Sequence, residues 1–533
     1  MAPNIVVNVN HTQYTVVKEV LKNIFGYNLA TSSSGDWDLY WADTGITQEL
    51  VSKLKPYQKV NHFPNMSCLA RKNNLGRNLM KMRKAFKRDY NFFPPTWLLP
   101  IQRNELQMEI AQGNHKTYIV KPEGLSQGKG IYLTRNLETI DSADHCIVQR
   151  YIRKPYLLDD LKFDLRLYVL VYGCDPLRIY LFKEGLARFA TENYVKPNRK
   201  NMDNLYMHLT NYAINKHSKN FIFNSNAENP NIGHKRSLAS IWKHIDEHGG
   251  DSKSIRRKIK RCIVKTLCAV QPQLSRCLRS CQPSNFENNI CFEILGFDIL
   301  LDHKLKPWLL EVNHSPSFTV DTPFDNKVKT ELIADTVRLL HMLPERRLDY
   351  WKKEQARIQS RAYSRVAQEK LTKEQREILK QEAMVNRDNY ELKHCGGFTR
   401  IYPDKKLDYK YQAFINYAEE ELEQFYGFRK RNSSVQTRLQ QKVKSRDIMK
   451  SASKNATISL SSVRPQTGKS RRNSSNMKGL NEEMVKPKQK LNSGVKTALV
   501  LEDRKNMPNR DKLPSARKPQ IKIVLSKYKE NTG

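Results

Sequence analysis

Two oxygen-bearing side chains, Glu311 and Asn313, stand two residues apart at the end of an apolar run in KPWLLEVNHSPSF, residues 306 to 318. Residues spaced by two point to the same face of a β-strand, so both side chains are expected to emerge together from a buried sheet. Polar oxygens placed there are unfavourable unless they bind something. The pair therefore predicts a binding site at the end of a strand that Pro316 closes.

A second apolar run, CFEILGFDILL (residues 291 to 301), precedes the first and is separated from it by a short polar loop. The two runs predict a β-hairpin, which would place Asp298 across from Glu311. Like charges placed together repel, and Mg²⁺ removes the repulsion because it binds such oxygens together with nucleotide phosphates. We therefore predict a Mg-nucleotide site, with solvent-facing strand ends as the alternative. Glu293, in the same run, is assigned a structural or supporting role.

A glycine-rich loop lies between two predicted strands in TYIVKPEGLSQGKGIYLTRN, residues 117 to 136. Its glycines allow backbone N–H groups to turn toward an anion, while Lys121 and Lys129 supply positive charge. No GK[ST] sequence follows and the next element is a strand, so this is not a Walker P-loop. The loop predicts a phosphate site, and a surface hairpin is the alternative.

Two β-rich runs come next. The first, residues 148 to 152, is interpreted as an edge strand whose backbone could hydrogen-bond an adenine. In the second, KFDLRLYVL, the charged residues Lys162, Asp164 and Arg166 alternate with apolar ones, so one face is polar and the other belongs to the core. This pattern fits an interior phosphate site and also fits an ordinary half-exposed strand.

Further polar groups end or interrupt apolar runs downstream. Arg188 lies among apolar residues in LFKEGLARFA, where an Arg is either paired structurally or binds a carboxylate bidentately. Thr210, Asn211 and Tyr212 end a short apolar run with hydrogen-bonding side chains. These residues are candidates for the same site.

The elements that must position these groups begin with a small α/β unit up to about Asn61, followed by a basic amphipathic helix in LARKNNLGRNLMKMRKAFK. A chain of 533 residues is long enough for two or three packed units. The start lacks the pattern of a secretory signal, so the nine cysteines are expected to be reduced thiols in the cytosol. No apolar run is long enough to span a bilayer.

The charge and hydropathy of the chain predict a polyanionic partner and an unfolded tail. The formal net charge is +38, which fits nucleic acid, an anionic membrane or an acidic protein. The mean hydropathy is −0.69. Residues 446 to 533 hold 21 Lys and Arg but only 7 Asp and Glu, with almost no aromatic residues, so they are predicted to be a disordered basic tail.

Seven strings in this sequence resemble the tubulin tyrosine ligase-like family and occur in the family's order. They cover roughly residues 1 to 345 and are KPEGLSQGKGIYL, QRYI, LKFDLRLYVLV, EGLARFA, HLTNYAINKHS, CFEILGFDILLD and KPWLLEVNHSPSF. The family has an ATP-grasp fold, in which ATP lies between two α/β subdomains. Its members join an amino acid to a protein carboxylate or terminus.

The resemblance implies a role for each matching position. The implied ATP contacts are Lys121, Gln127, Gly128, Gln149, Arg150, Tyr151, Ile152, Lys162, Asp164, Thr210 and Asn211. The implied Mg²⁺ ligands are Asp298, Glu311 and Asn313, and the residues around the incoming amino acid are Arg188, Tyr212, Lys235 and Lys329. The groups assigned to catalysis are Lys121, Arg166, Glu311 and His314, with His314 orienting substrate or supporting the metal site.

The reaction implied by the resemblance is ATP-dependent tubulin polyglutamylation through an acyl phosphate, by a monomer on the microtubule cytoskeleton of the cytoplasm, cilia or basal bodies. An Arg at position 188 suits free L-glutamate, which carries a second carboxylate. The alternatives are a glycine ligase of the same fold, an inactive microtubule-binding protein, and a nucleic-acid binder driven by the basic tail. No membrane partner is expected.

The predicted fold class is mixed α/β (α+β) with an ATP-grasp core. The expected segments are an N-terminal α/β domain (1–65), a central ATP-grasp subdomain (66–190), a C-terminal ATP-grasp subdomain with the metal site (191–345), a basic helical microtubule-binding extension (346–430) and the disordered tail (431–533). A solvated charged helix is the alternative for the extension.

Overall fold

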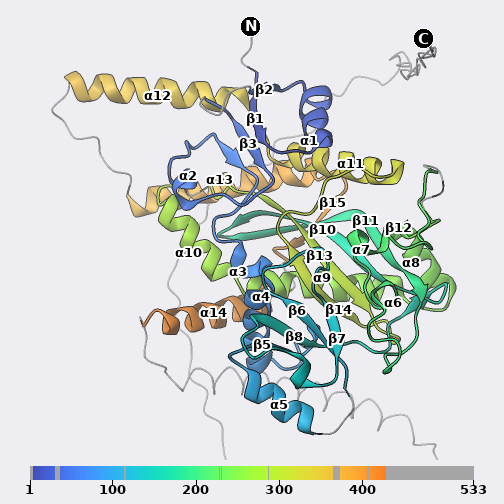
Figure 1. The fold of residues 1–533 in the computed structure, drawn as a ribbon. Coiled ribbons are helices and arrows are strands. Elements are labelled where there is room, and N and C mark those ends of the chain that lie inside the picture. Colours follow the sequence, from blue (N-terminus) through green and yellow to red (C-terminus); the bar gives the residue numbers. More distant parts are fainter. Residues whose placement is uncertain are drawn as a thin grey trace, which may run out of the picture. The chain divides into compact units, whose positions relative to one another are not determined.

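The computed structural model describes residues 4–427, apart from 31–35, 113–115, 227–228, 230, 286, 364–371 and 405–406. Figure 1 shows three sheets with helices packed around them. The predicted tail (431–533) lies outside the described residues. Within the described part, no helix combines the length and the apolar composition needed to cross a membrane, and all nine cysteines are free thiols.

The N-terminal sheet has four parallel strands in the order β2-β1-β3-β4. The strands are β1 (Val6–His11), β2 (Asn28–Ala30), β3 (Leu39–Ala42) and β4 (Lys59–Val60). The helical segments are α1 (Thr15–Glu19), a π-helical turn (Val20–Ile24) and α2 (Gln48–Ser52). The small α/β unit predicted from the sequence is thereby confirmed.

The second sheet is antiparallel and has the order β5-β8-β6-β7. Its strands are β5 (Thr96–Leu99), β6 (Tyr118–Pro122), β7 (Tyr132–Thr134) and β8 (Cys146–Arg150), and a 3₁₀ turn covers Leu137–Thr139. The helices alongside are α3 (Ser67–Ala70), α4 (Lys72–Ala85) and α5 (Arg103–Ala111). The predicted glycine-rich loop does join two strands, β6 and β7. The edge-strand interpretation of residues 148–152 is wrong, because β8 lies between β5 and β6.

The largest sheet carries the predicted hairpin. Its main path is antiparallel, in the order β12-β11-β10-β13-β14, with β9 added beside β10 and β15 beside β11. The strands are β9 (Leu157–Leu158), β10 (Leu161–Cys174), β11 (Leu177–Asn193), β12 (Lys235–Ser237), β13 (Glu293–Leu301), β14 (Pro307–Asn313) and β15 (Phe398–Tyr402). The helices connecting its strands are α6 (Leu205–His208), α7 (Tyr212–Asn215), α8 (Leu238–Glu247), α9 (Ser252–Cys268), α10 (Gln271–Cys281) and α11 (Pro323–Leu339).

Burial of both faces explains why the strands of this sheet read as long apolar runs. Leu165 and Leu167 of β10 join one hydrophobic core, which includes residues of α8, α9 and α10. Tyr168 and Leu170 face the other core, which includes α11 and the N-terminal unit. Every residue of β13 is buried. Charged side chains on these strands therefore need partners within the protein.

The predicted basic helical extension is partly built into the largest sheet. It contains α12 (Pro344–Tyr363), α13 (Lys373–His394) and α14 (Asp408–Phe425), but also β15, which pairs with β11. Glu391 of α13 is buried against Arg178 of β11, with Oε2 and Nη1 2.7 Å apart. The predicted boundary at residue 190 falls inside β11. Strand β10 pairs with β13, and β11 pairs with β12, so both strands belong to the largest sheet and not to the sheet of β6 and β8. The other domain boundaries stay predictions.

Candidate active site

The predicted carboxylate–amide cluster forms at the hairpin of β13 and β14. Asp298 pairs directly with Glu311 across the two strands, and Gly296 pairs with Asn313. Nδ2 of Asn313 donates to Oε1 of Glu311 at 3.2 Å and lies 3.5 Å from Oδ2 of Asp298. The structure therefore confirms that these three oxygen-bearing side chains converge.

Two arginines form ion pairs with the carboxylate of Asp298. Oδ1 of Asp298 accepts from Nε of Arg166 at 2.5 Å, and Oδ2 accepts from Nη2 of Arg188 at 2.8 Å. Burial alone would raise the pKa of Asp298, but the two guanidinium groups outweigh it and hold the pKa well below its usual range. Burial and the adjacent Asp298 raise the pKa of Glu311. A divalent cation fits here, because it would let both carboxylates ionise side by side.

Arg188 is committed to two carboxylates in this structure. Its Nε donates to Oδ1 of Asp164 at 2.8 Å, and its Nη2 bonds to both Asp164 and Asp298. The side chain is 12 % exposed. The structure thus shows Arg188 as a structural partner of Asp164 and Asp298. That it binds the carboxylate of a substrate stays a prediction.

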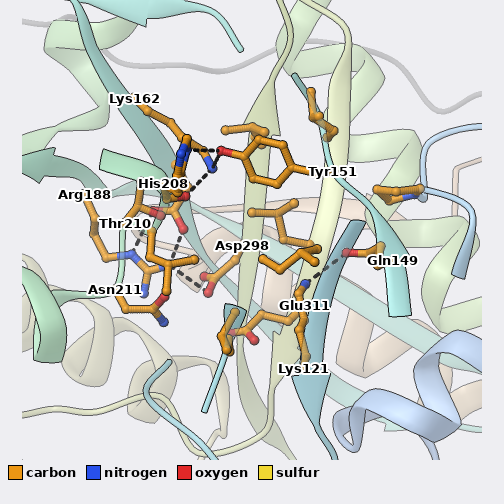
Figure 2. Close-up of a pocket in the computed structure, with 18 of the residues that line it drawn as sticks. Lys121, Gln149, Tyr151, Lys162, Arg188, His208, Thr210, Asn211, Asp298 and Glu311 are labelled. Atoms are coloured by element: carbon orange, nitrogen blue, oxygen red, sulfur yellow. Dashed lines mark hydrogen bonds and ion pairs between the residues drawn. The ribbon is translucent and has the colours of Figure 1, made fainter. Parts of the chain in front are cut away.

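Lys121, which is predicted to contact phosphate, comes from the strand before the glycine-rich loop. Nζ of Lys121 donates to Oε1 of Gln149 at 2.9 Å, which links β6 to β8 (Figure 2). Burial lowers the pKa of Lys121 to about 8, and only the more distant Glu311 and Asp298 oppose the shift. This buried cation has no carboxylate in direct contact among the residues described, so it is suited to bind an anion.

At the opposite end of the pocket, the ammonium group of Lys162 lies among apolar side chains. Nζ of Lys162 donates to the hydroxyl of Tyr151 at 3.0 Å and to the carbonyl of His208 at 2.5 Å (Figure 2). Burial lowers the pKa of Lys162 to about 7. The apolar walls that the sequence reasoning missed are Ile119, Ile131, Leu209, Leu300 and Leu310. Such walls fit a flat aromatic base.

We expect Lys162→Met to stabilise the protein in the absence of nucleotide, and most strongly near pH 6.5. The folded-state pKa of Lys162, about 7, lies below the ordinary lysine value of 10.5, so burying the charged form is unfavourable at any pH below about 7. The penalty shrinks as the pH rises from 7 toward 10.5, because the folded wild type then holds a neutral amine. Thermal melting should show a Tm gain of a few degrees at pH 6.5 and a smaller gain at pH 9. A constant gain would contradict this account.

The glycine-rich loop closes against the segment that carries Asn211. Gly128 has φ +87°, and a Cβ there would lie 2.5 Å from Cδ1 of Ile214 and 3.1 Å from Cγ of Asn211. Nζ of Lys72 donates to the carbonyl of Leu125 at 2.5 Å. Close approach and positive φ both require glycine at position 128.

A second cluster of charged residues lies beside Arg188. Lys235 of β12 is directly cross-strand from Arg188, so their side chains share a face. Nζ of Lys235 contacts Asp321 and Asp325, and it lies 3.8 Å from the ring centroid of Tyr212. Lys329 reaches Asp325 at 3.5 Å. Two of the four residues predicted around the incoming amino acid, Lys235 and Lys329, thus share Asp325, which the sequence reasoning missed. A third, Tyr212, covers the ammonium group of Lys235.

His314 lies outside the pocket lining, near the buried Glu293. The rings of His314 and His62 are 6.1 Å apart, while Nδ1 of His62 contacts Oε1 of Glu293 at 2.9 Å. His62, Glu293 and His314 are close enough to hold a metal ion, but Nε2 of His62 also bonds to the carbonyl of Ala42. Burial alone would lower the pKa of His62, but the adjacent Glu293 carboxylate outweighs this effect and raises that pKa. These contacts support the structural role predicted for Glu293.

The structure brings most of the predicted site residues into one pocket. Those that line it are Lys121, Gln149, Arg150, Tyr151, Ile152, Lys162, Asp164, Arg188, Thr210, Asn211, Asp298 and Glu311. Those outside the lining are Arg166, Asn313, Gln127, Gly128, His314, Tyr212, Lys235 and Lys329. Of these, Arg166 and Asn313 reach the pocket through Asp298 and Glu311. Arg150 points to Glu109, with which it forms an ion pair.

Comparison with known proteins gives one family and several named relatives. Residues 50–350 match the tubulin-tyrosine ligase family. A probable beta-tubulin polyglutamylase of Tetrahymena thermophila is 49 % identical over 78 % of this chain and 35 % of its own length. Tubulin polyglutamylase ttll6 of Danio rerio is 39 % identical over 82 % and 55 %, and TTLL6 of Mus musculus is 43 % identical over 77 % and 49 %. The chain thus spans between about a third and just over half of these relatives.

Proposed function

We propose, because this chain belongs to the tubulin-tyrosine ligase family, that it is an ATP-dependent tubulin polyglutamylase. The observation that supports this most is the convergence of Asp298, Glu311 and Asn313 beside two arginines and a buried lysine. That set has oxygens for a cation and cations for phosphates. It lacks the arrangement of a side-chain nucleophile with its base, so a substrate group must carry the transferred phosphoryl.

ATP would lie along the pocket with its base near the apolar walls. Tyr151 and Ile152 follow the last residue of β8 and line the pocket. The N–H of Tyr151 donates to the carbonyl of Thr117 at 2.9 Å, so the backbone of Ile152 would bind the adenine. Lys162, Asp164, Thr210 and Asn211 would contact the nucleotide between the base and the phosphates. The phosphates would be held by Lys121, Gln127 and Gly128.

Asp298, Glu311 and Asn313 would hold Mg²⁺, which when bound neutralises charge on the transferring phosphoryl group. Lys121, Arg166 and Arg188 add fixed positive charge at the same place, so little reorganisation is needed during the reaction. Arg188 would release part of its contact with Asp298 when substrate binds. His314, on the chain segment after Asn313, would orient the acceptor.

The reaction is the transfer of the γ-phosphoryl of ATP to an acceptor carboxylate oxygen, which breaks the bond to the β-phosphate oxygen and releases ADP. The amine of free glutamate then attacks the acyl carbon, forms the amide and expels phosphate, and the proton from nitrogen passes to solvent or phosphate. The protein positions the groups and supplies charge. No covalent enzyme intermediate forms.

Glutamate is the proposed amino acid because several cations surround the place where it would bind. Arg188 and Lys235 share a sheet face, and Lys329 lies near Lys235 across Asp325. Glutamate has two carboxylates and needs a cationic partner for each, whereas glycine has one carboxylate and needs only one such partner. The second candidate is therefore glycine ligation with the same phosphoryl chemistry.

The proposed partner is the acidic surface of microtubules, reached partly through α12. The first turns of α12 are fixed to the N-terminal unit, where Arg347 pairs with Asp38 at 2.9 Å and Trp351 Nε1 donates to Asp36 at 2.9 Å. Beyond these anchors, Lys352 and Lys353 are exposed. We propose that the monomer acts on the microtubule cytoskeleton, including that of cilia.

We expect binding to polymerised tubulin to fall steeply with salt. The attraction between exposed cations and an acidic surface is screened over about 10 Å at 0.1 M salt. Cosedimentation should therefore show an apparent Kd that rises at least about tenfold from 0.05 to 0.2 M salt. Binding that does not change with salt would contradict an electrostatic mode of docking.

The proposed function is tested by supplying labelled glutamate, glycine and tyrosine separately, with Mg-ATP and assembled microtubules. Label from glutamate alone, with ATP required, is the expected result. Incorporation of labelled glycine instead would support the phosphoryl-transfer chemistry but would exclude glutamate as the amino acid that is added. Microtubule binding without any label would support the inactive binding protein.

A further inference from the structure

The ammonium group of Lys235 is fully engaged by the protein. Nζ lies 2.8 Å from Oδ2 of Asp321 and 2.7 Å from Oδ2 of Asp325, and the ring of Tyr212 covers it at 3.8 Å. An ammonium has three N–H donors, and three neighbours surround this one. The carboxylate of a bound amino acid can therefore reach Lys235 only if one neighbour moves away.

The two carboxylates differ in their freedom to move. The side chain of Asp325 is 0 % exposed, and its backbone N–H donates to Oγ1 of Thr322 in the first turn of α11. Asp325 also lies 3.5 Å from the buried Lys329, so its departure would remove a carboxylate from two buried ammonium groups at once and, among the residues described, leave Lys329 without one. The side chain of Asp321 is 28 % exposed and lies before the helix begins. Asp321 is therefore the partner that can leave at the lowest cost.

The position of Lys235 suits a group that holds the amino acid during attack. Its cross-strand neighbour Arg188 contacts Asp298 at 2.8 Å. A carboxylate held at Lys235 would thus lie beside Arg188, whose side chain crosses β10 to contact Asp298 of the hairpin where the acyl phosphate is expected. The amine of the same molecule would then be directed toward that hairpin.

We propose that Asp321 is a displaceable internal carboxylate. It occupies, on Lys235, the position that a carboxylate of the incoming amino acid takes, while Asp325 remains the fixed partner. Exchanging one carboxylate for another keeps the buried ammonium paired throughout, which avoids the cost of an isolated buried charge. The inference rests on the proposed function, because it takes Lys235 as an amino-acid-binding residue.

The test is calorimetric titration of L-glutamate into the full chain with Mg²⁺ and a non-hydrolysable ATP analogue. Asp321→Asn removes the internal competitor, so glutamate should bind about three- to tenfold more tightly than to wild type. Asp325→Asn removes the fixed partner of Lys235 and Lys329, so binding should weaken about tenfold. A merely structural role for Asp321 would not tighten binding.

Asp159→Asn is the matched control. Asp159 pairs at 2.7 Å with Arg236, which follows Lys235 on β12 and therefore faces the opposite side of the sheet. The control removes the same charge at a similar place in the fold but leaves Lys235 untouched. Its affinity for glutamate should stay within about twofold of wild type.

Weaker or unchanged glutamate binding by Asp321→Asn would overturn the proposal, as would absence of glutamate binding to wild type and variant alike. Failure of the proposed function looks different, because wild type would then incorporate glycine in the labelling experiment. In that case the same titration is made with glycine, whose single carboxylate also needs a cation. Glutamate incorporation by wild type without tighter binding by Asp321→Asn would leave the function standing and exclude the displaceable carboxylate.

Discussion

Glu311→Gln is expected to lower the rate of glutamate incorporation by at least about 10³-fold. The substitution preserves shape but removes the charge that, with Asp298 across the hairpin, would hold the cation. It also removes the unfavourable meeting of two carboxylates, so the folded protein should be at least as stable as wild type. Loss of activity without loss of stability separates a catalytic role from a structural one. The measurement is initial rate with labelled glutamate, together with thermal melting.

Glu331→Gln is the matched control for this experiment. Glu331 pairs with Lys183 at 3.1 Å and is 38 % exposed on α11, away from the pocket lining. Its incorporation rate should stay within about twofold of wild type. An active Glu311→Gln enzyme would mean that the hairpin carboxylates do not hold the cation that the reaction needs.

Arg188→Ala is expected to reduce both stability and activity. Removing this buried guanidinium leaves Asp164, which is 3 % exposed, without its bidentate partner, and breaking a buried pair in this way costs about 3–5 kcal/mol. Asp298 also loses one of its two arginines, so incorporation should fall at least about 10²-fold. Chemical denaturation and steady-state rates measure the two effects.

A double variant separates the two roles of Arg188. Asp164→Asn combined with Arg188→Ala removes the unpaired charge, so it should recover part of the lost stability. Activity should not recover, because Asp298 still lacks Arg188. Recovery of activity together with stability would show that Arg188 acts only through the fold.

The sequence predicted those parts of the fold that depend on local periodicity. The alternation of Lys162, Asp164 and Arg166 with apolar residues identified the two faces of β10, and two adjacent apolar runs identified the hairpin of β13 and β14. What it could not predict is the pairing of segments far apart in the chain. The sequence predicts an edge strand at residues 148–152, because nothing in that run indicates that β5 will pair with β8. β15 lies in a helical, charged region and joins the core sheet only through long-range contacts with β11.

The same distinction between local patterns and long-range pairing applies to the residues of the candidate site. Asp298, Glu311 and Asn313 were found because they lie on one hairpin. The contact between Arg188 and Asp164 depends on the register of β10 and β11, and apolar spacing does not determine that register. Asp321 and Asp325 were missed because they precede and begin α11, where an acidic residue also stabilises a helix N-terminus. A carboxylate at that position therefore gave no separate signal of a role in binding.

The most direct test of the account uses an acidic acceptor peptide whose side-chain carboxylates carry heavy oxygen, together with Mg-ATP and free glutamate. The account predicts that glutamate becomes joined to the peptide and that the released phosphate gains one heavy oxygen atom for each bond formed, because the acceptor oxygen leaves with the phosphoryl group. Mass spectrometry of the peptide and of the phosphate measures both. Phosphate without heavy oxygen, or a peptide that gains no glutamate, would contradict the account.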